Sequence, residues 1–405
     1  MIRRKKFDFT LAGFLVLLIF IGCVSIFTAS TTTIGEYTTT QSYWWKQLIF
    51  AGISLGMIWL LIRLPMPILD LIIIPAYVLN LLALIAVLFT PAVNGAHRWF
   101  SFLGLNYQPS ESAKLLTILV VARAISRDNL TEIKQILYGL GLTLMPVLLI
   151  LIEPDFGTTL VFFFSLLAML VAAEVPLVYL LLLISPVVSM LSSLWLPAIF
   201  IWIAILVVLL LWARLSWVTI TIAGILNGFL ALIMPMFWNG LKDYQQSRIV
   251  SFFNPMADPL GAGYQIIQAK IAIGSGSILG KGWLMGTQKN MNFLPEHHTD
   301  FIFSVIGEEF GFIGAFLLLG VFFFFFWRLI TDIGEIKVRE RKIASAGIFA
   351  FLMFQTFINI GMNIGLVPAT GIPLPFVSYG GSNLLFNSLA VGVILKYLNE
   401  RGLMK

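Results

Sequence analysis

Scarce ionisable side chains gather at the mouth of one apolar helix, in FLPEHHTDFIFSVIGEEFG at residues 293–311. On a helix that starts near His298, the side chains of Asp300, Ser304 and Glu308 share one face. Charged side chains at membrane depth are costly, so they usually face a cavity or a partner. Asp300 could act as a general base, because a pocket at the membrane edge would raise its pKa above the usual value of about 3.9. The alternative is that Asp300 and Glu308 pair with nearby Lys or Arg side chains.

A second group of charged side chains follows an interfacial segment, in NGAHRWFSFLGLNYQPSESAKL at residues 94–115. Arg98 precedes Trp and Phe, which favour the headgroup level of a membrane. QPSESAKL then begins a helix, for which Ser110 is the expected N-cap. Glu111 and Lys114 are three residues apart and share one helix face. They form either an internal ion pair or a binding site for an anionic headgroup.

Two further motifs lie at tight junctions that we expect on the outer side. EPDFGTTL, at residues 153–160, places two acids around a proline, and Asp155 or Thr158 can cap the next helix. VPATGIPLPFVSYGGSNLL, at residues 367–385, predicts a rigid turn before the last helix. The alternative there is that backbone N–H groups at the helix start bind an anion.

The longest polar connection contains DPLGAGYQIIQAKIAIGSGSILGKGWLMGTQ at residues 258–288. Tyr264, Ile267 and Ile271 form an apolar stripe at helical spacing. This pattern predicts a helix that lies in the membrane interface or re-enters it. GSGSILGKG departs from a phosphate-binding P-loop at two required positions, so it does not indicate an ATP site.

The elements that must position these residues are membrane helices. The chain has 405 residues, of which 59% are hydrophobic and 11% charged, whereas soluble domains carry about 25% charged residues. We predict an all-α polytopic membrane protein that forms a single integral membrane domain over residues 1–405. Its only cysteine, Cys23, allows no internal disulfide. The expected spans are 9–30, 45–63, 68–90, 110–126, 134–152, 157–173, 177–194, 196–213, 216–238, 301–329, 343–365 and 378–397.

The distribution of basic residues predicts the orientation of these twelve spans. With the N-terminus in the cytoplasm, the inner segments hold 17 of the 25 Lys and Arg residues, as the positive-inside rule requires. An even number of spans returns the C-terminus to the cytoplasm. All three histidines, most acids and a large loop at 239–300 then lie outside. This topology accounts for the net charge of +6, so we expect no nucleic-acid partner.

Together these motifs resemble signatures of the SEDS family of cell-wall polymerases, in order along nearly the whole chain. The matching segments are NGAHRWF with QPSESAKL, EPDFGT, DPLGAGYQIIQAKIAIGSG, LPEHHTDFIFSVIGEEFG and GIPLPFVSYGGS. KGWLMGTQ leading to NFLPEHHTDF resembles the elongation branch of the family more than the division branch. The family has a core of ten spans, so twelve spans imply an extra helix pair near 177–213. Two added spans leave the sides of the membrane unchanged.

The resemblance implies a peptidoglycan glycosyltransferase of the bacterial cytoplasmic (inner) membrane. Such an enzyme polymerises lipid II into glycan strands on the outer face during cell elongation. The resemblance marks Asp300, in HTDF, as the catalytic general base. It also implies a class B penicillin-binding protein (a transpeptidase) and other elongation-complex membrane proteins as partners. Candidates for binding the substrate are Arg98, Glu111, Lys114, Asp155, Lys270, Glu296, His298 and Ser378.

Departure of a polyprenyl pyrophosphate requires positive charge beside it. Arg98, Lys114 or Lys270 can supply that charge, or a divalent cation such as Mg²⁺ or Mn²⁺ held by outer acids. Three other functions are compatible with the sequence. A lipid II flippase would need polar groups along the whole path across the membrane, whereas the ionisable residues of this chain gather in the outer half. The others are a division-type polymerase and a non-catalytic scaffold.

Overall fold

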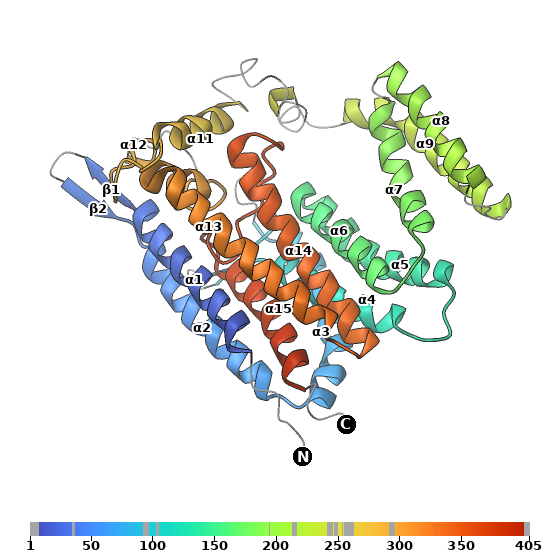
Figure 1. Cartoon of the computed structure of the whole chain (residues 1–405), viewed down its shortest axis with the longest axis horizontal. Coiled ribbons are helices and arrows are strands. Elements are labelled where there is room, and N and C mark those ends of the chain that lie inside the picture. Colours follow the sequence, from blue (N-terminus) through green and yellow to red (C-terminus); the bar gives the residue numbers. More distant parts are fainter. Residues whose placement is uncertain are drawn as a thin grey trace.

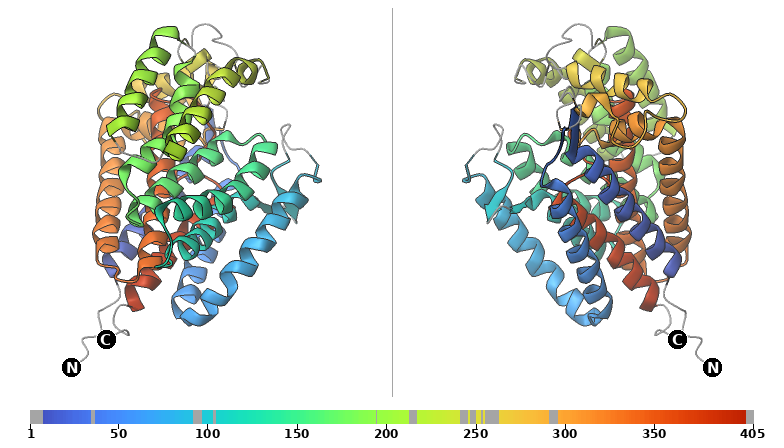
Figure 2. Two further views of the ribbon diagram at one scale, coloured as in Figure 1. Left: turned by 90° about the vertical axis from the view of Figure 1, so that its right-hand side faces the viewer. Right: turned by 90° about the vertical axis from the view of Figure 1, so that its left-hand side faces the viewer.

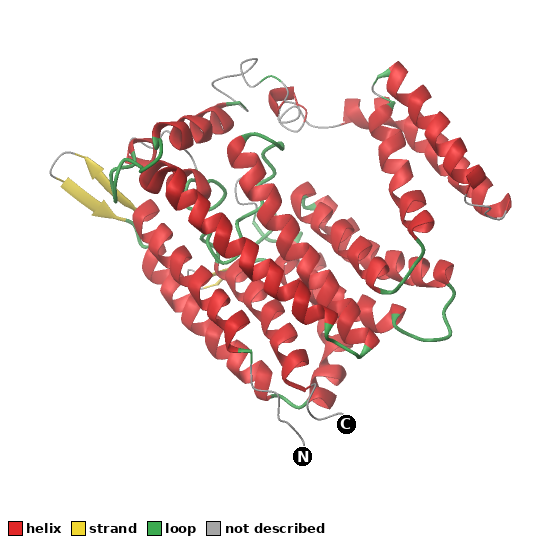
Figure 3. Cartoon of the chain, in the orientation of Figure 1, coloured by secondary structure: helices red, strands yellow, loops and turns green. Residues whose placement is uncertain are grey.

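The computed structural model describes residues 8–34, 37–91, 97–102, 105–193, 195–212, 217–240, 246, 250–252, 254, 263–290 and 296–400. The described chain is a bundle of helices with two short antiparallel hairpins (Figures 1 and 3). The hairpins are β1 (Thr31–Ile34) with β2 (Tyr37–Thr40), and β3 (Phe100–Phe102) with β4 (Leu105–Tyr107). The helices are α1 (Phe9–Ser30), α2 (Tyr43–Arg63), α3 (Met66–Val87), α4 (Pro109–Ile125), α5 (Glu132–Ile152), α6 (Phe156–Ala172), α7 (Leu177–Ser192), α8 (Leu196–Trp212), α9 (Trp217–Gly240), α11 (Tyr264–Ser275), α12 (Thr287–Asn290), α13 (Ile302–Gly334), α14 (Arg339–Ile364) and α15 (Gly381–Asn399).

Each of the twelve predicted spans coincides with a helix, namely α1 to α9 and α13 to α15. Among the described residues, eight of these helices are long and apolar enough to cross a bilayer: α1, α2, α3, α5, α9, α13, α14 and α15. The prediction of an all-α polytopic membrane protein is therefore confirmed. Helices α4, α6 and α8 have 17 residues each and α7 has 16, near the lower limit for a crossing. The number of crossings stays a prediction.

The two ends of the bundle differ in what they carry. Helix α1 begins and α15 ends at the same end, at the bottom of Figures 1 and 2. The hairpin of β1 and β2 lies at the other end, together with α11 and α12. This arrangement agrees with the expected placement of both termini on one side. Parts of the predicted outer loop 239–300, including 255–262 and 291–295, lie outside the described residues.

Helices α14 and α15 occupy the centre of the bundle. In the most apolar 18-residue windows of these two helices, 72% and 78% of residues are buried, against 28% in α3. Helix α14 packs on α4, α6 and α13, and α15 packs on α2 and α4. Because neighbouring helices screen them from lipid, α14 and α15 can carry polar side chains that a lipid-facing helix could not.

Helix α13 is kinked near its start, at Gly311, where φ is 64°. A Cβ atom at this position would lie 2.3 Å from the amide nitrogen of Gly280, so only glycine fits. The kink opens the helical hydrogen-bond ladder. The carbonyl of Glu308 instead accepts from the amide of Lys281 (3.0 Å), and that of Glu309 from the amide of Gly282 (3.1 Å). The segment after α11 is thereby bound to the backbone of α13.

Helix α11 forms where the sequence predicts an interfacial helix. Its buried residues are Ile266, Ala269 and Ala272, and it packs on α13 and α14. Ile271 is 45% exposed, so the predicted apolar stripe is not the face that packs on the protein.

Helices α7, α8 and α9 form a group that stands apart at the right of Figure 1. Both α8 and α9 pack on α7, which has a small contact with α6. The group contains the predicted extra pair at 177–213.

Candidate active site

The turn that carries Asp300 runs from Glu296 to Phe301 and leads into α13. The carbonyl of Glu296 accepts from the amides of Thr299 (3.2 Å), Asp300 (3.1 Å) and Phe301 (3.3 Å). The loop between α14 and α15 also binds this turn. There, the hydroxyl of Ser378 donates to the carbonyl of Thr299 at 2.5 Å. The backbone around Asp300 is therefore fixed on two sides.

Two asparagines on α14 hold the main chain of Asp300. Its carbonyl oxygen accepts from Nδ2 of Asn359 at 2.9 Å and from Nδ2 of Asn363 at 3.0 Å. Asn359 also donates to the carbonyl of Ile372 at 2.8 Å. Oδ1 of Asn363 accepts from the amide and hydroxyl of Ser304, at 3.1 and 2.6 Å. Sequence reasoning missed both residues, although two asparagines four residues apart in FINIGMNIG are unusual in a membrane helix.

The segment at residues 370–372 lies between the Asp300 turn and the start of α6. Gly371 has a φ of 71°, and a Cβ atom there would lie 3.4 Å from Oδ2 of Asp300. On the other side, a Cβ atom at Gly157 would lie 2.9 Å from the carbonyl oxygen of Thr370. The EPDFG and HTDF motifs, which the sequence separates widely, thus meet across this segment.

Arg98 and Asp155 brace the junction between α5 and α6. Asp155 caps α6, accepting from the amide and hydroxyl of Thr158 at 3.2 and 2.9 Å, which confirms the predicted cap. Arg98 donates to the carbonyls of Glu153 (2.9 Å) and Pro154 (2.6 Å), and lies 4.0 Å from the Asp155 carboxylate. These contacts engage most of the guanidinium, so substrate would reach only its free edge.

Glu153 is a buried acid that the sequence analysis did not select as a site residue. Neither of its carboxylate oxygens has a hydrogen-bond partner among the described residues. Burial raises the pKa of Glu153 to about 8, and the nearby Asp155 adds to this, against the opposing charge of Arg98. Glu153 is therefore largely protonated at neutral pH. Its position in the EPDFG motif is the feature of the sequence that could have identified it as a site residue.

Glu111 and Lys114 form a buried ion pair of 2.8 Å on α4, which confirms the ion-pair alternative. Asn383, at the start of α15, also donates to Glu111 at 3.0 Å. The predicted N-cap at Ser110 is wrong. The cap is Gln108, because the following proline fits the first helical position. Contact of Glu111 or Lys114 with a substrate stays a prediction.

Among the three predicted cations, Arg98, Lys114 and Lys270, the side chain of Lys270 is the most accessible to a substrate. It is exposed on α11 and makes no ion pair with the residues that the structure describes. Its amine lies over the C-cap of α14, since a Cβ atom at Gly365 would be 2.3 Å from Nζ. Because Asn363 is two residues earlier, Lys270 adjoins the end of the helix that holds Asp300.

His298 and Glu296 stabilise the turn. The ring of His298 stacks on Tyr43 with centroids 4.3 Å apart. Burial, with His297 nearby, lowers the pKa of His298 to about 4, so His298 is neutral at pH 7 and supplies no positive charge. The carboxylate of Glu296 accepts from the hydroxyl of Thr299 at 3.1 Å.

The two remaining acids of the motif are paired. Glu308 binds Lys281 at 2.6 Å, and Glu309 binds the fully buried Lys289 at 2.5 Å. For Glu308 this confirms the ion-pair alternative. Across the described residues, no three His, Cys, Asp or Glu side chains come together to hold a metal ion. A divalent cation held by outer acids therefore stays a prediction.

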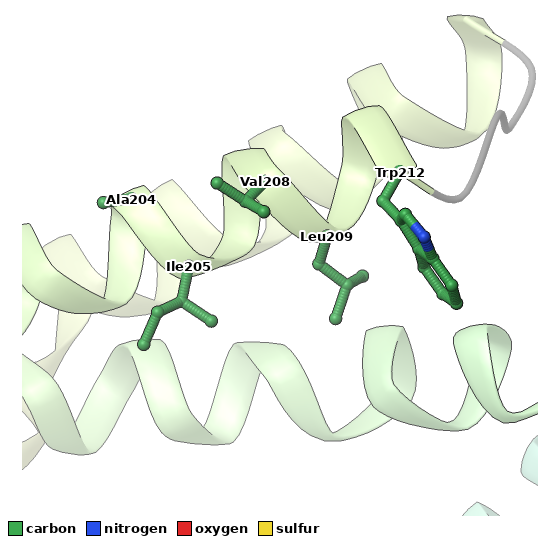
Figure 4. Close-up of a pocket in the computed structure, with 5 residues that line it drawn as sticks. All are labelled: Ala204, Ile205, Val208, Leu209 and Trp212. Atoms are coloured by element: carbon green, nitrogen blue, oxygen red, sulfur yellow. The ribbon is translucent and has the colours of Figure 1, made fainter.

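An apolar pocket of about 420 Å³ lies beside α8, which carries none of these residues. It is lined by Ala204, Ile205, Val208, Leu209 and Trp212 (Figure 4). None of the predicted site residues lines it, so it is not the site of the chemistry.

Several known proteins are similar to this chain. The family described as cell cycle protein, which comprises FtsW, RodA and SpoVE, matches residues 9–202 and 196–402. The peptidoglycan glycosyltransferase MrdB of Escherichia coli K12 is 36% identical over 331 residues, covering 81% of this chain and 78% of that protein. The peptidoglycan glycosyltransferase RodA of Treponema pallidum is 32% identical over 348 residues, covering 78% and 80%.

Solved structures show the same fold. A chain from a study of structural coordination of polymerization and crosslinking by a peptidoglycan synthase complex superposes with a TM-score of 0.72 at 25% identity, covering 99% of this chain and 100% of that one. RodA of Thermus thermophilus gives a TM-score of 0.64 at 24% identity, covering 98% of each chain.

Proposed function

We propose that this chain, a peptidoglycan glycosyltransferase that belongs to the FtsW, RodA and SpoVE family, builds glycan strands with Asp300 as its general base. It is a multi-pass protein of the bacterial inner membrane. The observation that carries the proposal is the Asp300 turn. Loop and helix contacts hold the backbone that bears the Asp300 carboxylate, which lies beside Gly371, in a chain 36% identical to a named glycosyltransferase.

The reaction would join two lipid II units on the outer face of the membrane. Asp300 accepts the proton of the acceptor sugar hydroxyl as its oxygen attacks the anomeric carbon of the donor. The new glycosidic C–O bond forms while the bond from that carbon to the polyprenyl pyrophosphate breaks. The partial exposure of Asp300 lets an acceptor reach the carboxylate, and the fixed turn sets its direction.

Lys270 is the best-supported group for receiving the leaving pyrophosphate. Lys114 is neutralised by Glu111 inside the bundle, and most of Arg98 is engaged by the EPDFG junction. Lys270 is exposed and lies beside the helix end that holds Asp300. An ammonium at this place can stabilise the charge that develops as the pyrophosphate departs.

The elongation role and the partner are the finer parts of the proposal. The motif KGWLMGTQ leading to NFLPEHHTDF favours elongation over division. One structural relative comes from a complex that coordinates polymerization and crosslinking. We expect this chain to work with a transpeptidase of the class B penicillin-binding type.

The test is polymerisation of labelled lipid II by the purified chain with its cognate transpeptidase. Wild type should give glycan polymer on a gel, and Asp300→Ala should give none. Asp128→Ala is the matched control, because Asp128 is 93% exposed in the loop before α5 and pairs only loosely with Arg339, at 3.6 Å. Polymer from folded Asp300→Ala at the wild-type level would move the base elsewhere. No polymer from wild type would contradict the polymerase function itself.

A further inference from the structure

The carbonyl of Asp300 is an unusual point of convergence. Asn359 and Asn363 are one helical turn apart on α14, so their amides reach the same place. Both side chains are fully buried, and both donate to this one oxygen. An acceptor held by two donors from a rigid helix cannot turn without losing both hydrogen bonds. The peptide plane that joins Asp300 to Phe301 is therefore fixed.

We propose that Asn359 and Asn363 are positioning residues that set the direction of the Asp300 carboxylate. The inference rests on the proposed role of Asp300 as general base. Neither asparagine side chain is exposed, so each would act through Asp300 and not on the substrate.

Asn359 fixes the position of the Asp300 turn relative to the segment at residues 370–372, which the carboxylate faces. The same Nδ2 atom that binds the carbonyl of Asp300 also donates to the carbonyl of Ile372. Ile372 follows Gly371, which borders Oδ2 of Asp300. One amide thereby sets the backbone that bears the carboxylate and the segment that the carboxylate faces. A shift of about 1 Å between them would be enough to lower the rate of a proton transfer greatly.

Asn363 fixes the helix that follows. Its carbonyl oxygen accepts two hydrogen bonds from Ser304 in the first turn of α13, while its amide binds Asp300. The start of α13 and the Asp300 turn are therefore held by a single side chain. Apolar packing could join these helices as firmly, but it lacks the directionality of a hydrogen bond. A general base requires this directionality, whereas the stability of the fold does not.

The test measures initial rates with the full-length chain, its transpeptidase and labelled lipid II. Asn359→Ala and Asn363→Ala should each lower kcat about 10- to 100-fold, with KM for lipid II within about twofold of wild type. Asn359→Gln retains both donors and should recover several-fold of the loss. Asn227→Ala is the matched control. Asn227 is a buried asparagine on α9 that donates to Ser185 and to the carbonyl of Ala223, and its loss should leave kcat unchanged.

The outcomes separate this inference from the proposed function. Folded Asn359→Ala and Asn363→Ala variants with wild-type kcat would overturn the positioning role while Asp300 stays essential. A raised KM at constant kcat would overturn it as well, since it would indicate contact with substrate. If the alanine variants do not fold, Ser304→Ala decides, because it removes the shorter of the two hydrogen bonds to Oδ1 of Asn363, and an unchanged kcat would count against the proposal. An inactive wild type would refute the polymerase and the inference with it.

Discussion

Helices α14 and α9 both bury asparagines, and the surroundings of those asparagines differ. Asn359 and Asn363 on α14 reach out of their helix to the carbonyl of Asp300. Asn227 on α9 closes a local network, donating to Ser185 and accepting from Ser189, which in turn accepts from Trp202 at 2.7 Å. The two asparagines on α14 connect that helix to the proposed general base, whereas the network around Asn227 joins three helices to each other.

The difference follows from what surrounds each helix. In the most apolar window of α9, 17% of residues are buried, against 72% for α14. The described parts of α7, α8 and α9 contain no Asp, Glu, Lys, Arg or His. A helix that faces lipid can hide a few neutral amides and hydroxyls but no charges. Ionisable chemistry is therefore confined to the part of the bundle where α14 and α15 are screened by other helices.

The largest effect on stability is expected at the buried ion pair of Glu309 and Lys289. Glu309→Ala would leave Lys289 charged and fully buried, which typically costs roughly 3–5 kcal/mol. Ser185→Ala, in the group of α7 to α9, removes a neutral hydrogen bond and should cost about 1 kcal/mol. Thermal unfolding in detergent measures both. Equal losses would mean that the two regions are not distinguished by charge.

The next largest effect concerns the pH dependence of stability. The folded chain keeps a proton on Glu153 up to about pH 8, whereas the unfolded chain releases it above 4.5. Stability should therefore fall as pH rises between these values, by up to ~1.4 kcal/mol per pH unit. Glu153→Gln should flatten this fall and raise Tm at pH 7–8. If Tm of the variant follows pH as steeply as that of wild type, Glu153 is ionised in the folded state.

A smaller effect is expected at Gly371. Gly371→Ala places a side chain at a φ of 71°, at a cost of about 1–2 kcal/mol, and moves the wall beside Asp300. The kcat for polymerisation should fall with little change in KM. Gly224→Ala on α9 meets nothing within 4 Å, so it should leave the rate unchanged and stabilise the helix by about 0.5–1 kcal/mol. Matching kcat values for the two variants would show that the segment at 370–372 does not border the reacting groups.

What the sequence predicted well was local. Long apolar runs located the helices of all twelve predicted spans, and spacing within one turn gave the cap at Asp155 and the pair of Glu111 with Lys114. What it missed depends on contacts between distant segments. Asn359 lies 59 residues from Asp300, and no local pattern couples them. The same holds for Lys289 on α12, whose partner Glu309 lies on α13 just before its kink.

The central claim is that the Asp300 carboxylate takes the proton from the acceptor sugar. Asp300→Asn tests it most directly, because the amide keeps the size of the side chain but cannot serve as that base. The measurement is the initial rate of labelled lipid II polymerisation by wild type and Asp300→Asn, with equal Tm verified first. We predict a loss of at least about 100-fold in kcat. A folded Asp300→Asn variant that polymerises at the wild-type rate would contradict the account.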